Sequence, residues 1–296
     1  MAKKDITERI LLAYNDVFAD VVNGLLFKGQ QLISPEDLVD QAPRASYKAD
    51  GKIREIERDV AKRWLKNNIR IACVGLENQT KPDADMVLRV YGYDGAEYRS
   101  QLLKENLNNP RYPVVTLVLY FGYKKHWDEP IWLHDAIDIP DIFKEYVPNI
   151  KINLFEIAYM TREQLLYFHS DFRIVADYFI QKREKNDYIP SPDKLEHVEA
   201  VLQLLSVMTD DTRFEDILNK KDESGKEGGV HTMCDVLDRI EAKGEIKGAI
   251  KEAIRLYHEE MNLLPSEIEK KIMVRFSLSK AEAENYIIEA LGVQPA

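Results

Sequence analysis

The stretch of residues 59–101 constrains the fold most, because it combines strand-like apolar segments with regularly placed polar side chains. Side chains two residues apart share one face of a strand, so Glu77 and Gln79 are expected to point the same way. A tight connection at 65–68 folds the preceding strand, which carries Asp59, back beside them. Two carboxylates and an amide then meet at one end of a sheet. This arrangement suits a hard divalent cation that activates water against a phosphate.

The rest of the N-terminal half predicts a mixed α/β domain. Apolar residues recur at helical spacing near the N-terminus, with Thr7 as a start signal and Gly29 just after the end. Gly92 and Gly95 lower the propensity of a later helical region, which leaves room for a kink or a split there. The expected elements, in chain order, are a helix at 6–27, a loop at 30–43, strands at 44–51, 54–64 and 69–79, a helix at 84–107, and strands at 113–122 and 150–159.

From residue 161 onward the pattern becomes helical. The tail has no sustained heptad seam, so it is either a small helical module or an oligomerisation arm that joins copies of the chain into a homo-oligomer. Helices are expected at 161–184, 193–208, 231–262, 266–276 and 280–291, with Ser279 as the cap of the last one. The expected regions are a core domain at 1–160, a helical extension packing on the core at 161–218, a polar, glycine-containing linker at 219–229 and a helical tail at 230–296.

Composition narrows the class of protein. The formal net charge of −10 argues against a protein that coats nucleic acid through a broad basic surface. Basic residues gather at 52–70, either as a strip beside the acidic site or as the solvated face of an amphipathic hairpin. No apolar run approaches the roughly 18 residues that a membrane span needs, and the first eight residues lack the apolar region of a signal peptide. We therefore expect a cytoplasmic protein that does not contact the membrane.

Four short sequence features follow one another in a recognisable order. They are Glu57-Arg58-Asp59-Val60, Leu76-Glu77-Asn78-Gln79-Thr80, Arg89-Val90-Tyr91-Gly92-Tyr93, and the run from Pro113 to Gly122. Their order and approximate spacing resemble the PD-(D/E)xK nuclease superfamily and, within it, the recombination-promoting nuclease (Rpn) family, whose members are also labelled transposase-like. The resemblance covers about residues 10–160 well and the helical tail only loosely. No single feature is specific, and the ordered combination carries the resemblance.

The resemblance implies both a fold and a chemistry. The fold is α/β, with a mixed-sheet, restriction-endonuclease-like core of αβββαβ order followed by a helical C-terminal region. The chemistry is Mg²⁺-dependent hydrolysis of DNA phosphodiester bonds, with Mn²⁺ as a substitute ion, linked to recombination or mobile DNA. Asp59 and Glu77 are the implied metal ligands, and the backbone carbonyl of Asn78 is the third oxygen donor. Such an ion polarises the scissile phosphate and lowers the pKa of a bound water.

Gln79 stands where the superfamily usually has a lysine. A glutamine can orient the nucleophile through hydrogen bonds, but it brings no positive charge, so activity is expected to depend more on the metal. Arg89 either contacts the phosphate or pairs with Glu77, and Tyr93, one turn later, shares its helix face. Family members show an aspartate on the first helix, three residues before a phenylalanine. That position is Asn15 here, with Asp16 next to it, and the polar candidates on this helix are Asn15, Asp16, Asp20 and Asn23.

Two less specific interpretations stay open. In the first, Asp59 is a turn residue and Glu77 a surface group, and there is no metal. In the second, the nuclease-like fold binds DNA or a protein partner without cutting, which the uncharged Gln79 and the acidic net charge favour. The run Asp83-Ala84-Asp85 is predicted to be a turn and helix cap rather than a sugar-nucleotide site.

Overall fold

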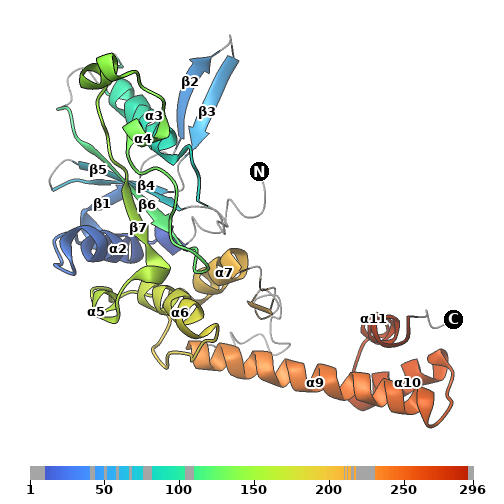
Figure 1. The fold of residues 1–296 in the computed structure, drawn as a ribbon. Coiled ribbons are helices and arrows are strands. Elements are labelled where there is room, and N and C mark those ends of the chain that lie inside the picture. The colour runs from blue at the N-terminus through green and yellow to red at the C-terminus, as the bar shows by residue number, and fades with distance from the viewer. Residues whose placement is uncertain are drawn as a thin grey trace. The chain divides into compact units, whose positions relative to one another are not determined.

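The computed structural model of the protein consists of two compact units, Met1–Met233 and Cys234–Ala296 (Figure 1). The structure describes residues 11–40, 44–49, 52–57, 60–66, 69–75, 82–103, 110–209, 211, 213–214, 217 and 231–292.

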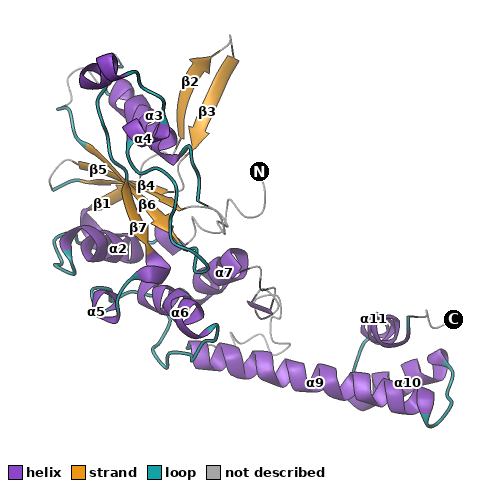
Figure 2. Cartoon of the chain, viewed as in Figure 1, coloured by secondary structure: helices purple, strands orange, loops and turns teal. Residues whose placement is uncertain are grey.

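A five-stranded mixed sheet forms the centre of the N-terminal unit, in the order β1-β4-β5-β6-β7 (Figure 2). Its strands are β1 (Leu38–Asp40), β4 (Val60–Trp64), β5 (Ile69–Gly75), β6 (Val114–Tyr120) and β7 (Asn153–Glu156). The pairs β1–β4 and β4–β5 are antiparallel, whereas β5–β6 and β6–β7 are parallel. The expectation of a mixed α/β domain is confirmed.

A separate two-stranded sheet interrupts this order along the chain. It pairs β2 (Arg44–Ala49) with β3 (Lys52–Glu57) in an antiparallel register. The prediction of one strand at 54–64 is therefore wrong, because β3 pairs with β2 while β4 pairs with β1 and β5 in the larger sheet. The predicted loop at 30–43 is also partly wrong, since it contains the short strand β1, which pairs Leu38 with Trp64.

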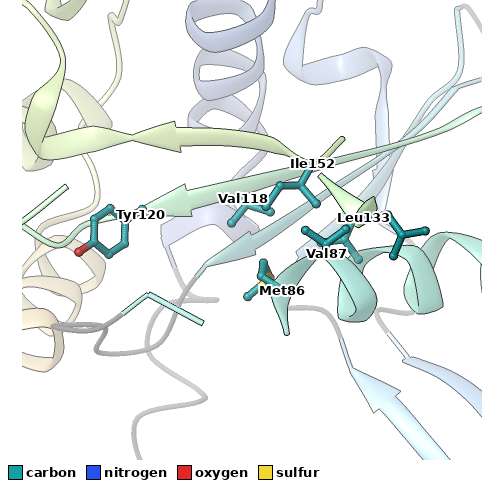
Figure 3. Close-up of a cluster of buried hydrophobic side chains, with 7 residues drawn as sticks. Met86, Val87, Val118, Tyr120, Leu133 and Ile152 are labelled. Atoms are coloured by element: carbon teal, nitrogen blue, oxygen red, sulfur yellow. The ribbon is translucent and has the colours of Figure 1, made fainter. Parts of the chain in front are cut away.

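Helices α2 (Asn15–Phe27) and α3 (Met86–Ser100) flank the large sheet on opposite sides (Figure 1). Residues of α3 pack into one cluster with side chains of β6 and of the segments before β7 (Figure 3). The buried members of this cluster are Met86, Val87, Val90, Val118, Tyr120, Leu133 and Ile152. Helix α3 continues without a break through Gly92 and Gly95, so the allowance for a kink proves unnecessary.

Two glycines determine how helix α2 ends and how it packs: Gly29 follows its last turn, and Gly24 lies within it. Lys28 and Gly29 have φ angles of 53° and 85°, in the left-handed region that closes many helices, which confirms Gly29 as the end signal. Thr7, the predicted start signal, lies outside the described residues. Inside the helix, Gly24 faces the buried ring of Phe168, and a Cβ at this position would lie 2.3 Å from the ring atom Cε1. A glycine is what allows the two segments to approach so closely.

The helical part of the N-terminal unit begins after β7. The predicted helix at 161–184 is in fact two helices, because Asp20 of α2 accepts the backbone N–H groups of His169 and Ser170 and so fixes the chain between them. The helices after β7 are α5 (Arg162–Leu165), α6 (Phe172–Lys185) and α7 (Val198–Thr209), with a 3₁₀ segment at Ile157–Tyr159. Before β7 the chain forms α4 (Leu133–Ala136) and the 3₁₀ segments Pro35–Asp37 and Asp141–Tyr146.

The C-terminal unit is a small helical assembly with its own core. Helix α9 (Met233–Glu259) runs into it, and α10 (Pro265–Phe276) and α11 (Lys280–Leu291) complete it. Ser279 and Glu282 form a reciprocal capping box at the start of α11, which confirms the predicted cap. The core residues are Ile250, Ile254, Ile268, Ile272, Ala283 and Ile287. Among the helices described for the whole chain, none combines the length and apolarity needed to cross a bilayer.

One added methyl group is expected to have opposite effects at two helical glycines. Gly24→Ala should lower the free energy of unfolding by about 1–3 kcal/mol, because the new Cβ overpacks against Phe168. Gly92→Ala should raise it by about 0.5–1 kcal/mol, because no described atom lies within 4 Å of the new Cβ and alanine favours the helix. Urea unfolding followed by circular dichroism measures both changes, and a Gly24→Ala variant as stable as the parent would contradict the close packing of α2.

Candidate active site at the carboxyl edge of the sheet

The strand registers bring four strand ends to one edge of the large sheet. Val60, where β4 begins, pairs next to the end of β5, since its partner is Cys73. Gly75, the last residue of β5, pairs with Leu119 near the end of β6. Tyr120 and Glu156, the last residues of β6 and β7, pair with each other. We call the edge defined by Val60, Gly75, Tyr120 and Glu156 the carboxyl edge, and it is where open α/β sheets bind ligands.

The residues predicted to bind the metal ion and to orient the nucleophile lie outside the described residues. They are Asp59, Glu77, Asn78 and Gln79. In the sequence, Asp59 directly precedes the first residue of β4, and Glu77 follows the last residue of β5 by two positions. Their roles therefore stay predictions, whereas the strand ends that flank them are described.

Arg89 and Tyr93 interact directly on α3, as their spacing of four residues predicts. The Tyr93 hydroxyl oxygen accepts hydrogen bonds from Arg89 Nε at 3.3 Å and from Nη2 at 3.2 Å. Tyr93 is buried, with 6% of its surface exposed, whereas 45% of the Arg89 side chain is exposed. The buried tyrosine thus supports a guanidinium that still reaches solvent.

Asp83 holds the same guanidinium from another side. Its Oδ2 atom accepts a hydrogen bond from Arg89 Nη1 at 2.5 Å, and its Oδ1 atom accepts one from the backbone N–H of Asp85 at 2.9 Å. The pKa of Arg89 is raised above its ordinary value: burial acts to lower it, and the hydrogen bonds to Asp83 and Tyr93, with the charge of Asp83, outweigh that effect. Arg89 therefore remains a cation.

The predicted turn at Asp83-Ala84-Asp85 is confirmed, and its first residue also forms an ion pair with Arg89. Asp85 occupies the N-cap position of α3, although its side chain makes no capping hydrogen bond within the described part of the chain. The ion pair of Asp83 with Arg89 was not predicted, because a separation of six residues across a turn and a helix start has no sequence signature. The alternative pairing of Arg89 with Glu77 stays a prediction, since Glu77 is not among the described residues.

The polar residues of α2 bind neighbouring segments of the chain. The Asn15 amide donates to the backbone carbonyls of Pro35 and Leu38 at 3.1 and 3.2 Å. The buried Asn23 donates to the carbonyl of Ile33 at 2.8 Å and accepts the Ile33 N–H at 3.0 Å. Both asparagines thereby fix the loop that leads from α2 to β1.

Asp16, the predicted upstream residue of the site, pairs with a histidine of the helical region. Its Oδ2 atom lies 2.9 Å from Nε2 of His197, and the His197 ring stacks on Tyr14 with ring centroids 3.7 Å apart. The backbone N–H of His197 also donates to the buried Asp171 at 2.6 Å. Asp16 therefore helps to join α2 to the segment before α7, and its role at the metal site stays a prediction.

The basic residues at 52–70 do not share one solvated face. Lys62 is fully buried; its Nζ atom donates to the carbonyl oxygen of Ala13 at 2.6 Å and to the carboxylate of Asp40. Arg63 stacks over the ring of Tyr112, with its guanidinium carbon 4.8 Å from the ring centroid. Lys62 therefore belongs neither to an exposed basic strip nor to a solvated face, and for Arg63 both interpretations stay open.

Among the side chains that the structure describes, no group of three or more His, Cys, Asp or Glu residues could hold a metal ion. The described part of the carboxyl edge thus contributes strand ends and the Asp83–Arg89–Tyr93 cluster to the candidate site. These observations define a mixed α/β protein with a fixed, ion-paired arginine at the start of the helix that connects two parallel strands.

Comparison with protein families identifies the class to which this chain belongs. The family described as "Putative transposase, YhgA-like" matches residues 66–213, which is half of the 296 residues. The chain belongs to this family of YhgA-like transposase proteins, which is consistent with the Rpn resemblance of its sequence. The match includes α3 and the helices up to α7. Neither the curated proteins nor the solved structures give a match.

Two neighbouring acids of α2 should respond very differently to truncation. Asp20 is buried and accepts hydrogen bonds from three donors of the 169–170 segment at 2.7–3.0 Å, so Asp20→Ala should cost about 2–3 kcal/mol of unfolding free energy by leaving these donors unpaired. Asp16→Ala removes a half-exposed ion pair and should cost at most about 1 kcal/mol. Denaturant titrations of both variants test this order, and equal losses would show that Asp20 is not the main link between α2 and this segment.

Proposed function

We propose that this protein is a metal-dependent DNA endonuclease of the PD-(D/E)xK type, acting in DNA recombination or on mobile DNA. The observation that carries the proposal is the meeting of the start of β4 and the end of β5 at the carboxyl edge. These are the two strand ends next to which Asp59 and Glu77 stand in the sequence. Membership of the transposase-like family supports a role on DNA.

The order of elements around the sheet supports the proposed core. Leaving aside the β2–β3 hairpin, the chain runs α2, β1, β4, β5, α3 and β6, and the four strands are neighbours in that order. Two antiparallel pairs are followed by one parallel pair across the α3 connection. This order supports an αβββαβ core in which β1, β4 and β5 are the first three strands and the β2–β3 hairpin is an insertion, whereas the predicted first strand at 44–51 belongs to the hairpin.

The chemistry of the proposed ligands fits a hard divalent cation. Asp59 and Glu77 would offer carboxylate oxygens, and Asn78 would offer its carbonyl oxygen, which are the donors that Mg²⁺ and Mn²⁺ take. Bound there, the cation would polarise the scissile phosphate and lower the pKa of a water molecule. Gln79 would orient that water through a hydrogen bond.

Arg89 is the described residue best suited to a phosphate. It is a fixed cation at the start of α3, and a guanidinium matches the geometry of phosphate oxygens. Its cluster lies near the carboxyl edge, because Met86 at the start of the same helix packs with Val118 and Tyr120 of β6. Arg89 would therefore hold the substrate backbone, with Tyr93 supporting it.

A second function, DNA or protein binding without cleavage, is favoured by two observations from the sequence. Gln79 supplies no positive charge at the position where the superfamily has a lysine, and the chain carries a net charge of −10. An inactive domain would keep the sheet and the Arg89 cluster but would not hydrolyse DNA. Cleavage assays with a DNA-binding assay beside them separate the two functions.

We expect Asp59→Ala and Glu77→Ala each to reduce Mg²⁺- or Mn²⁺-dependent plasmid cleavage to background, because each removes one proposed metal ligand. The measurement is nicking and linearisation of supercoiled plasmid by the purified full-length protein, with and without each metal. Glu163→Ala, which removes an exposed acid on α5, is the matched control and should cut like the parent.

The controls decide what a failure means. Circular dichroism and thermal unfolding must show that both variants remain folded. If both cut as well as the parent, the assignment of the site is wrong. If the parent protein cuts DNA with none of the metals tested, but binds DNA in a binding assay, the non-cleaving function is the correct one.

We also propose that the C-terminal unit joins copies of this chain into a homo-oligomer. Several of its apolar side chains are exposed, most of all Val274 on α10 at 85%. Contiguous exposed apolar patches are typical of interaction surfaces, and we infer that these side chains contribute to one. The residues are Ile246, Leu256, Met261, Leu264, Val274 and Ile288.

Val274→Lys should shift the full-length protein toward the monomer, because it places a charge on that apolar surface. Sedimentation velocity over a range of concentrations measures the shift, and Lys270→Gln, one turn earlier on the same helix, is the control that should leave it unchanged. A parent that sediments as a monomer at every concentration would overturn the proposal.

A further inference from the structure

Asp83 uses its two carboxylate oxygens for two different tasks. Oδ1 accepts the backbone N–H of Asp85 and so shapes the turn that starts α3, at a distance of 2.9 Å. Oδ2 accepts from Nη1 of Arg89 at 2.5 Å. The side chain is only one-fifth exposed, so it is largely enclosed by the structure that it organises. One carboxylate thus ties the direction of the Arg89 side chain to the backbone of the helix start.

Tyr93 completes the fixation from the opposite end of the guanidinium. Its hydroxyl oxygen accepts from Nε and from Nη2. Of the five N–H groups of Arg89, these contacts and the one to Asp83 use three. Counting only contacts with described residues, one N–H on each terminal nitrogen is left for a ligand. Two donors on neighbouring nitrogens are what a phosphate accepts from an arginine.

We propose that Asp83 is a positioning residue, which fixes the guanidinium of Arg89 in the orientation that receives a non-bridging oxygen of the substrate phosphate. This inference rests on the proposed nuclease function. A long, half-exposed arginine samples many rotamers when it has no partner, and each must be given up when a phosphate binds. Asp83 and Tyr93 impose the orientation before the substrate arrives, so the donors are preorganised for the charge that develops at the phosphate.

The negative charge of Asp83 weakens phosphate binding, although its hydrogen bond positions Arg89. An experiment can therefore distinguish a positioning role from electrostatic attraction of the substrate. A carboxylate beside Arg89 repels an incoming phosphate and weakens ground-state binding. Removing the charge should therefore relieve some repulsion while it frees the guanidinium. The expected signature is a loss in kcat without a rise in KM, because misplacement of a group by even a small distance is felt in the transition state.

Asp83→Asn is the decisive variant, because the amide oxygen can still accept the Asp85 N–H while the charged partner of Arg89 is lost. We expect kcat for Mg²⁺-dependent cleavage of a DNA duplex to fall about tenfold with KM unchanged within about twofold. Asp85→Asn, an equal change two residues away at an exposed position, should leave both constants at parental values.

A double-mutant cycle shows whether Asp83 acts through Arg89. If it does, Asp83→Asn has no further effect in an Arg89→Gln background, since the group that it positions is already gone. A tenfold loss in both backgrounds would overturn the proposal and leave Asp83 as a residue of the turn alone. So would a parental kcat in Asp83→Asn.

A second readout tests the positioning without cleavage. In protein labelled with ¹⁵N-arginine, the Nη1–H signal of Arg89, which donates to Asp83 and is identified by its loss in Arg89→Gln, should exchange slowly with water in the parent and in Asp85→Asn, and fast in Asp83→Asn. Slow exchange in all three would overturn the proposal. If the parent does not cut DNA and the exchange result still holds, the nuclease function has failed while Asp83 does hold Arg89.

Discussion

Strand β5 pairs with an antiparallel strand on one side and with a parallel strand on the other, and this arrangement organises the N-terminal unit. Its antiparallel pairing with β4 is reached through a tight connection, and its parallel pairing with β6 requires a long crossover, which α3 provides. The crossover must begin where β5 ends, so the start of α3 comes to the carboxyl edge. The same pairing brings the start of β4 there. One central strand therefore determines which chain segments can contribute to a common site.

Buried polar groups fix the segments around this sheet. Asp20, Asn23, Lys62 and Asp171 are all buried, and each makes at least two hydrogen bonds to other parts of the chain. A buried polar group without partners would be costly, whereas one with several partners allows few alternative positions. Among them, Asp20 ties α2 to the segment at 169–170, and Asp171 ties the start of α6 to the segment before α7.

Local patterns predicted most elements of the fold, including α3, β5, β6 and the helices of the C-terminal unit. The predicted helix at 6–27 is interrupted at Tyr14, whose backbone is extended, so only its second part is α2. They failed where long-range pairing decides. Residues 54–64 read as one strand because both halves have strand composition, and only the partners β2, β1 and β5 assign them to two sheets. Residues 161–184 read as one helix because the break at 169–170 is made by Asp20, about 150 positions earlier in the chain.

The features of the candidate site fall into the same two groups, those that local sequence patterns predict and those that only the folded structure reveals. The sequence by itself determined the residue types at the strand ends, the spacing that lets Arg89 and Tyr93 interact, and the turn at Asp83, because all of these depend on neighbours along the chain. Only the tertiary structure decided that Asp83 pairs with Arg89, that Lys62 is buried, and that Asp16 binds His197. The contacts of Lys62 and Asp16 join segments whose proximity is set by sheet register and helix packing, and the Asp83–Arg89 pair depends on how the turn and the helix start orient two side chains. No local periodicity encodes either arrangement.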